Sequence, residues 1–223
     1  FQYRQEEQAV LEHTEAIISL STAQEFPLWV ALATVLQGWA LAKRGEEKEG
    51  LACIHQGLAL YRALGGELIQ SYFLALLAET YGEIGQTGKG LAVLAEALDA
   101  VHRTGEHFWE AELYRLKGEL TLQQESQKAK GKAQKAKVPN PKSQLPTPSS
   151  EAEACFLKAI EIARKQQAKS LELRATMSLA RLWQRQGKKD EARQMLAAIY
   201  GWFTEGFDTK DLQEANELLE ELA

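Results

Sequence analysis

Apolar residues recur at spacings of three and four along most of the chain, as they do on one face of an α-helix. Alternating Val, Ile and Thr runs bounded by Asn-Gly or Asp-Gly turns, which mark β-hairpins, do not occur in the sequence. The pattern therefore predicts an all-α protein.

The helical pattern repeats with a period of about 40 residues, since residues 36–65 align with residues 76–105 at every position. Each copy predicts two antiparallel helices that approach closely where their side chains are small. The small residues are Gly38, Ala78, Gly118 and Ala180 in the first helices, and Gly50, Gly90, Ala152 and Ala192 in the second helices. Gly45, Gly85 and Gly187 fall where a first helix must end and turn.

In the third repeat the second helix arrives about 22 residues late. Residues 126–150 account for the delay, and they hold six lysines, four of the five prolines and no acidic residue. Because this composition cannot bury enough apolar surface to offset the entropy of ordering, we expect a disordered insertion inside one hairpin rather than a linker between domains. Its lysines could attract RNA or an anionic membrane, but it has no interleaved aromatic residues or arginines.

The small residues, the turn glycines and the aromatic residues Tyr81 and Trp183 resemble the signature of the tetratricopeptide repeat (TPR), although the usual period of that repeat is 34. The resemblance implies a single TPR-like α-solenoid over residues 1–223. Its expected parts are a partial repeat at 4–24, hairpins at 27–64, 67–104, 106–168 and 170–203, and a capping helix at 208–222. We expect Asp208 or Thr209 to begin the capping helix, with Leu212, Ala215, Leu219 and Leu222 on its buried face.

Two C-terminal segments resemble the C-terminal repeat region of certain bacterial signalling proteins, namely "LRATMSLARLWQRQGKKDEAR" and "YGWFTEGFDTKDLQEANELLEEL". Those proteins join a class III adenylate or guanylate cyclase domain to an AAA-like or STAND ATPase. The resemblance implies the scaffold or sensor arm of such a protein. Phe1 already lies inside a helical pattern, so we expect a piece of a longer chain.

The chain has a net charge of −5, and residues outside the basic insertion are more acidic still, which argues against a surface for duplex nucleic acid. No apolar run is long enough to cross a membrane. Cys53 and Cys155 lack the spacing of metal ligands, so we expect reduced thiols and a cytoplasmic location.

The sequence offers no catalytic constellation, and we expect neither an enzyme nor a cofactor or metal site. "GQTGKG" (85–90) lacks the Ser or Thr and the four-residue gap of a phosphate-binding loop, and it follows a predicted helix instead of a strand. His102 and His107 bracket a turn without the i, i+4 spacing of a helical metal pair.

The remaining candidate site is the inner groove that the TPR resemblance implies, lined by the first helices. This groove would bind a protein or peptide partner, or another domain of the parent chain, through complementary charges. The alternative is that these residues lie on ordinary helix faces that contact only solvent. The candidate residues are Trp39, Lys43, Tyr72, Glu79, Glu83, Glu112, Arg115, Glu119, Arg174, Arg181 and Arg185, with Val35 and Met177 at equivalent offsets. Repeats two and three would then present an acidic wall and repeat four a basic one.

Protein binding is therefore the expected function. Self-association that oligomerises the parent protein is the alternative. Four of the five tryptophans, namely Trp39, Trp109, Trp183 and Trp202, are expected to pack helix pairs together, and Trp29 to pack against the N-terminal helix.

Overall fold

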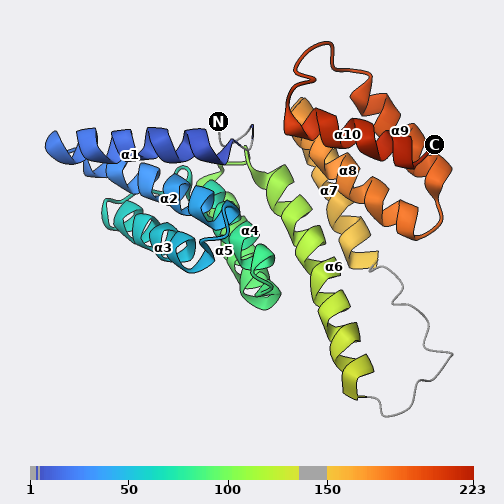
Figure 1. Cartoon of the computed structure of the whole chain (residues 1–223), viewed down its shortest axis with the longest axis horizontal. Coiled ribbons are helices and arrows are strands. Elements are labelled where there is room, and N and C mark those ends of the chain that lie inside the picture. Colours follow the sequence, from blue (N-terminus) through green and yellow to red (C-terminus); the bar gives the residue numbers. More distant parts are fainter. Residues whose placement is uncertain (1–3, 5, 136–149) are drawn as a thin grey trace. The chain divides into compact units, whose positions relative to one another are not determined.

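A computed structural model of the chain describes residues 4, 6–135 and 150–223, with side chains omitted for 131–135. This part of the chain contains ten helices and no strand, so the all-α prediction is confirmed (Figure 1). The helices are α1 (Glu7–Ala23), α2 (Pro27–Lys43), α3 (Glu47–Ala63), α4 (Gln70–Glu83), α5 (Thr87–Thr104), α6 (Glu110–Lys135), α7 (Ser150–Lys165), α8 (Lys169–Arg185), α9 (Lys189–Tyr200) and α10 (Lys210–Glu221).

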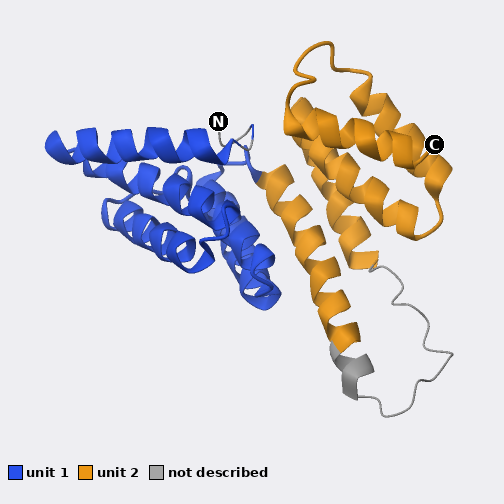
Figure 2. Ribbon diagram, viewed as in Figure 1, with its two compact units in different colours: residues 1–109 blue, residues 110–223 orange. Residues whose placement is uncertain are grey.

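The chain divides into two compact units, residues 1–109 and residues 110–223 (Figure 2). The first unit contains α1 to α5, with α2 packed on α3 and α4 on α5. The second contains α6 to α10, with α6 packed on α7, α8 on α9, and α10 on both α8 and α9. The expectation of one continuous solenoid over both units stays a prediction.

Close approach of small residues builds the hairpin of α2 and α3. A methyl group added to Gly38 would lie 2.6 Å from the carbonyl oxygen of Gly50 and 2.7 Å from the backbone nitrogen of Ile54. Ile54 itself is fully buried beside this contact. The helices therefore touch backbone to backbone, which only glycine permits at this distance.

The same arrangement recurs between α6 and α7. A methyl group on Gly118 would lie 2.4 Å from a ring carbon of Phe156, which is fully buried. Phe156 thus fills the layer that the small residue opens, as the repeat alignment predicts.

The turns between helices follow the repeat as well. Gly45, Gly85 and Gly187 have φ angles of +90°, +75° and +81°, the left-handed conformation in which glycine carries no steric penalty. The turns that follow second helices contain Gly65 and Gly105 with positive φ, but also Glu25 and Gln167, both at +56°. The repeat alignment pairs these last two with Gly65 and Gly105, so non-glycine residues here adopt a conformation that favours glycine.

Helix α6 differs from the expectation. It continues to Lys135, so disorder from residue 126 onward is wrong for 126–135. Gln, Lys and Ala, which make up most of residues 126–135, are strong helix formers. Ser126 and Lys128 also hydrogen-bond back to Leu122 and Gln124, one turn earlier. The rest of the expected insertion, up to 149, lies outside the described residues.

Helix α10 closes the second unit. Leu212, Ala215, Leu218 and Leu222 are buried against a core that includes Leu173 and Leu196, while Leu219 is only half-buried. Leu219 still packs against this core, and Leu218, which the sequence analysis did not place on this face, is buried more deeply.

The start of α10 also differs. Thr209 precedes the helix as expected, but its side chain makes no capping hydrogen bond. Its hydroxyl instead donates to the carbonyl oxygen of Gly206, at 2.6 Å.

Helix α10 is polar at the positions through which a first helix meets its partner. By the 40-residue period, Gln213, Glu217 and Glu220 occupy the positions at which a first helix meets its partner, and all three are exposed. At these positions α2 carries the buried residues Ala31, Val35 and Gly38. A solvated face of this kind suits the end of an array, and the capping role of α10 stays a prediction.

Candidate partner-binding surface

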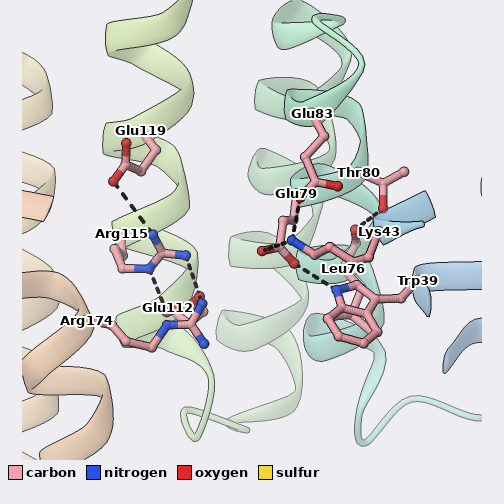
Figure 3. Close-up of polar contacts among 10 residues, drawn as sticks. All are labelled: Trp39, Lys43, Leu76, Glu79, Thr80, Glu83, Glu112, Arg115, Glu119 and Arg174. Carbon is pink, nitrogen blue, oxygen red and sulfur yellow. Dashed lines mark hydrogen bonds and ion pairs between the residues drawn. The ribbon is translucent and has the colours of Figure 1, made fainter. Parts of the chain in front are cut away.

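In the first unit, four of the predicted groove residues form one polar network (Figure 3). Trp39 Nε1 donates to Glu79 Oε2 at 3.1 Å, and Lys43 Nζ donates to Glu79 Oε1 at 3.1 Å. Lys43 also forms an ion pair with Glu83 and lies over the Trp39 ring, 5.7 Å from its centroid. The network therefore joins α2 to α4.

Burial shapes the ionisation of this network. Burial alone would lower the pKa of Lys43, but the carboxylates of Glu79 and Glu83 outweigh it and raise the pKa above its ordinary value. Burial raises the pKa of Glu83, and Lys43 opposes that shift only in part. Lys43 thus stays cationic at neutral pH.

Two of the predicted residues in this unit are not available at the surface. Trp39 is 1% exposed, and Val35 is fully buried, so both belong to the core. Tyr72 is half-buried and stacks on Trp109 with ring centroids 4.6 Å apart.

The second unit holds a comparable network. Glu112 accepts two hydrogen bonds from Arg115, at 2.7 and 2.9 Å, and pairs with Arg174 at 2.9 Å (Figure 3). Glu119 accepts from Ser178 Oγ at 2.6 Å, and Arg115 lies 3.7 Å from it. These contacts join α6 to α8.

Helix α10 contributes two residues to this face that the groove prediction did not include. Arg181 pairs with Glu214 at 3.1 Å. Burial raises the pKa of Asp211, and the nearby Arg174 opposes the shift. Extending the 40-residue offset into 208–222 would have found Glu214, the equivalent of Arg174, because α10 occupies a first-helix position; Asp211 lies three residues earlier, outside the offsets used.

The predicted acidic and basic walls are therefore largely neutralised within each unit. Glu79 and Glu83 bind Lys43, and Glu112 binds two arginines. Met177 and Glu112 are buried rather than exposed. Arg185 is exposed and has no partner among the described residues, so it is the member of the set whose charge is fully directed to solvent.

The other features singled out in the sequence have structural roles. Residues 85–90 cover the end of the turn after α4 and the first turn of α5. The Nδ1 atom of His102 donates to the carbonyl oxygen of Leu98 at 2.6 Å. Within the described ranges no group of three or more His, Cys, Asp or Glu residues is placed to hold a metal ion, and none of the helices there is long and apolar enough to span a bilayer.

The cysteines are free, and burial raises the pKa of both Cys53 and Cys155, so both are thiols at neutral pH.

The tryptophans divide into two groups. Trp39 is buried, and Trp183 is half-buried with Nε1 donating to Glu153 at 2.7 Å. Trp29 and Trp202 are 56% and 58% exposed. The expectation that Trp202 packs a helix pair together is therefore wrong. Trp29 lines a pocket with Ile17 and Leu20 of α1, and more than half of its surface stays exposed.

Comparison with known proteins gives one sequence relative and clear structural neighbours. No family model matches the chain. An uncharacterized protein of Rhizobium meliloti (strain 1021) is 29% identical over 149 residues, which make up 66% of this chain and 12% of that protein. The chain thus spans only a small part of the length of this curated relative.

The structural neighbours include a kinesin light chain candidate of Podosopora anserina with nearly identical TPR-like repeats and a single-substitution variant of it. For the first, the TM-score is 0.54, and the aligned region includes 88% of this chain and 94% of the neighbour. For the variant, the TM-score is 0.55, and the aligned region includes 88% of this chain and 93% of the neighbour. Both are 17% identical to this chain. Together with the helix hairpins described above, these likenesses show that the chain has an all-α fold of TPR-like repeats.

Proposed function

We propose that the chain is a protein-binding module that acts as the scaffold or sensor arm of a larger bacterial signalling protein. The TPR-like fold supports protein binding, because such arrays present extended surfaces. The Rhizobium relative is much longer than the region it shares with this chain, which supports an arm within a larger protein.

The sequence of the C-terminal repeats favours a parent protein of the cyclase–ATPase type. The free thiols of Cys53 and Cys155 favour a cytoplasmic location, because thiols stay reduced there. In such a parent, partner binding to the arm would change the state of the catalytic part.

The observation that carries the proposal is the polar face of the first helices. In the second unit this face combines the paired arginines Arg174 and Arg181 with the solvent-directed Arg185. Because the neighbouring carboxylates are already engaged, the exposed cation is the group that a partner carboxylate can reach. We expect an acidic peptide segment to bind here.

Fluorescence anisotropy with a library of labelled acidic peptides tests this proposal on the full chain. Arg185→Glu should weaken the binding of the selected peptides about tenfold, whereas Arg193→Glu, on the exposed face of α9, should not change it. Arg181→Glu is a less clean test because it also breaks the ion pair with Glu214. Equal effects of Arg185→Glu and Arg193→Glu, or no binding by any acidic peptide, would remove this surface from consideration.

Self-association of the parent protein is a second candidate, favoured by large apolar side chains that stay exposed in the first unit, such as Phe26 and Trp29. Sedimentation of the isolated chain separates the two functions. A stable dimer at micromolar concentration supports assembly, and a monomer supports partner capture.

A further inference from the structure

A pocket opens at the surface of the first unit where the chain turns from α1 into α2. Its volume is about 340 Å³, and its lining consists of Ile17, Leu20, Ser21, Gln24, Phe26 and Trp29. Leu20, Phe26 and Trp29 are 65%, 55% and 56% exposed, whereas Ser21 is buried. Large exposed apolar side chains and one small buried residue therefore border the same open space.

The turn from α3 into α4 has the same backbone geometry as the turn from α1 into α2. In the first turn, the N–H of Phe26 donates to the carbonyl oxygen of Ser21 at 2.8 Å. In the second, the N–H of Gly66 donates to the carbonyl oxygen of Tyr61 at 2.9 Å. Each donor follows a residue with positive φ, Glu25 or Gly65. The 40-residue period thus relates the two turns in backbone conformation as well as in sequence, and it pairs Ser21 with Tyr61.

A tyrosine ring fills the second turn. Tyr61 is 4% exposed, and its hydroxyl accepts a hydrogen bond from the backbone N–H of Ile69 at 3.3 Å. Its ring lies edge-on to Phe73, with ring centroids 5.4 Å apart. A methyl group on Gly66 would lie 2.4 Å from a carbon of the Tyr61 ring, so the ring packs directly on the backbone of the turn. In this turn the chain supplies its own aromatic ring.

The turn between α1 and α2 lacks such a ring, because Ser21 stands at the tyrosine position. Phe26 replaces Gly66, but its ring is more than half exposed and borders the pocket instead of closing it. The N–H of Trp29, the equivalent of the group that bonds Tyr61, donates to the carbonyl oxygen of Phe26 at 3.1 Å. A ring that enters the pocket therefore has no need of a hydroxyl, and a phenyl ring suits the space as well as a phenol.

The lining of the pocket matches an uncharged occupant. None of the six lining residues carries a charge, and Glu25, outside the lining, is the one charged residue between positions 16 and 42. A carboxylate or ammonium group in the pocket would lose hydration without meeting a counter-charge in the lining. A neutral aromatic ring would instead bury apolar surface of its own and of the walls.

The exposed walls favour a side chain of a polypeptide over a free small molecule. Sites for small molecules usually bury about 70–90% of the ligand surface. Here Leu20, Phe26 and Trp29 keep most of their surface open to solvent. A side chain brings flanking residues that cover such walls, as they do around the aromatic anchors of protein interfaces.

We propose that the pocket between α1 and α2 binds one Phe or Tyr side chain of a partner protein, in the place that Tyr61 occupies between α3 and α4. The partner supplies the ring that this turn lacks. The site belongs to a turn of the first unit, whereas the function proposed above uses the arginines of α8, so the inference goes beyond that function.

Neutral peptides with one variable central residue test the proposal on the full chain. The probe carries para-fluorophenylalanine in a Gly/Ser background and is followed by fluorine NMR. Unlabelled peptides with Phe or Tyr at the central position should displace it with similar midpoints, and those with Lys or Glu should be at least about tenfold weaker. Free para-fluorotoluene should bind more weakly than the probe. Equal competition by the Lys or Glu peptide, or tighter binding of para-fluorotoluene, would overturn the proposal.

Filling the pocket from within locates the site. Ser21→Tyr places a ring where Tyr61 lies in the next repeat, so it should raise the melting temperature and weaken probe binding at least about tenfold. Ser19→Tyr, at an exposed position of the same helix, is the matched control and should change neither. A loss of probe binding with Ser19→Tyr as large as that with Ser21→Tyr would overturn the proposal.

Trp29→Ala gives an independent test should Ser21→Tyr fail to fold. It removes an exposed wall of the pocket, so it should leave the melting temperature nearly unchanged and weaken probe binding about tenfold. Unchanged binding of the probe by folded Trp29→Ala would overturn the proposal.

Sedimentation separates a partner protein from a second copy of the chain. We expect a monomer whose pocket is open to the probe. A dimer that Ser21→Tyr or Trp29→Ala dissociates would show that a second copy covers the pocket, and would overturn the proposal of a partner side chain. The acidic-peptide assay at Arg185 does not depend on Ser21 or Trp29, so the two proposals fail separately.

Discussion

Gly38 and Gly50 lie backbone to backbone across the hairpin of α2 and α3, and a methyl group on either one would lie 2.6 Å from the carbonyl oxygen of the other. The atoms in the way belong to the backbones of two packed helices, which cannot rotate aside. The two glycines therefore set the distance between the helices.

We predict that Gly38→Ala destabilises the protein by about 1–3 kcal/mol, the usual cost of forcing extra volume into a packed core. Urea unfolding followed by circular dichroism measures the change. Gly88→Ala, at an exposed helical position of α5, is the matched control and should stabilise by about 0.5 kcal/mol because alanine favours the helix. If Gly38→Ala were as stable as the wild type, the close approach would not be a constraint on the fold.

The residues that replace glycine at left-handed turns give a second prediction. Gln167→Gly should stabilise the protein by about 1 kcal/mol, because Gln167 has a φ of +56° that glycine adopts without steric cost. The repeat-equivalent reverse change, Gly105→Gln, should destabilise by a similar amount. A Cβ at Gly105 would meet no atom within 4 Å, so any loss there comes from the backbone alone. Thermal melting measures the change in melting temperature of each variant relative to the wild type. Changes of the same sign in Gln167→Gly and Gly105→Gln would contradict the explanation.

The fold could be predicted from the sequence because its determinants repeat. Gly38, Gly50 and Gly45 recur at 40-residue intervals as the same or similar residues, and each acts through local geometry that depends on residue size or φ. The left-handed conformation of Glu25 and Gln167 was not predicted, because neither residue type is typical of a left-handed turn. Only their alignment with Gly65 and Gly105 reveals it.

The candidate site was harder to predict than the fold. Helical offsets placed Lys43 and Glu79 on one face, but whether their charges point to solvent or to each other depends on side-chain rotamers and on the distance between α2 and α4. Composition also misled at 126–135, where lysines suggested disorder although the same residues favour helix.

The polar network of the first unit gives a third prediction. Lys43→Met should destabilise the protein by about 2 kcal/mol, because it leaves the partly buried carboxylates of Glu79 and Glu83 close together without their cation. Adding Glu83→Gln should recover part of the loss by removing one of these charges. Urea unfolding of the two single variants and the double variant measures the coupling. Strictly additive losses would mean that Lys43 and Glu83 do not interact.

The insertion gives a fourth prediction. We predict that a Gly/Ser linker of equal length in place of residues 136–149 leaves the melting temperature unchanged, since we expect a Pro-rich composition with few apolar residues to bury little surface. The same replacement over residues 126–135 should instead reduce the helical circular dichroism signal, because it removes the end of α6. A fall in melting temperature with the first replacement would contradict the prediction of a dispensable insertion.

Glu172 gives a pH-dependent prediction in the second unit. Its side chain is 5% exposed and pairs with Arg164 at 2.7 Å and Lys169 at 2.8 Å. Burial alone would raise the pKa of Glu172, but the hydrogen bonds from Lys169 and Arg164 outweigh burial and lower it below the ordinary value of 4.5. The ionised carboxylate therefore stabilises the fold above about pH 4.5, and this contribution is lost as the pH falls through the lowered pKa.

Glu172→Gln should consequently destabilise the protein by about 1.5 kcal/mol at pH 7, and the difference from the wild type should shrink as the pH falls below 4.5. Thermal melting of both proteins in low salt, from about pH 3 to about pH 7, measures the difference on both sides of the ordinary pKa of 4.5. Glu191→Gln, on the exposed face of α9, serves as the control and should match the wild type throughout. A deficit of Glu172→Gln that stays constant with pH would show that it arises from packing and not from the charge of the carboxylate.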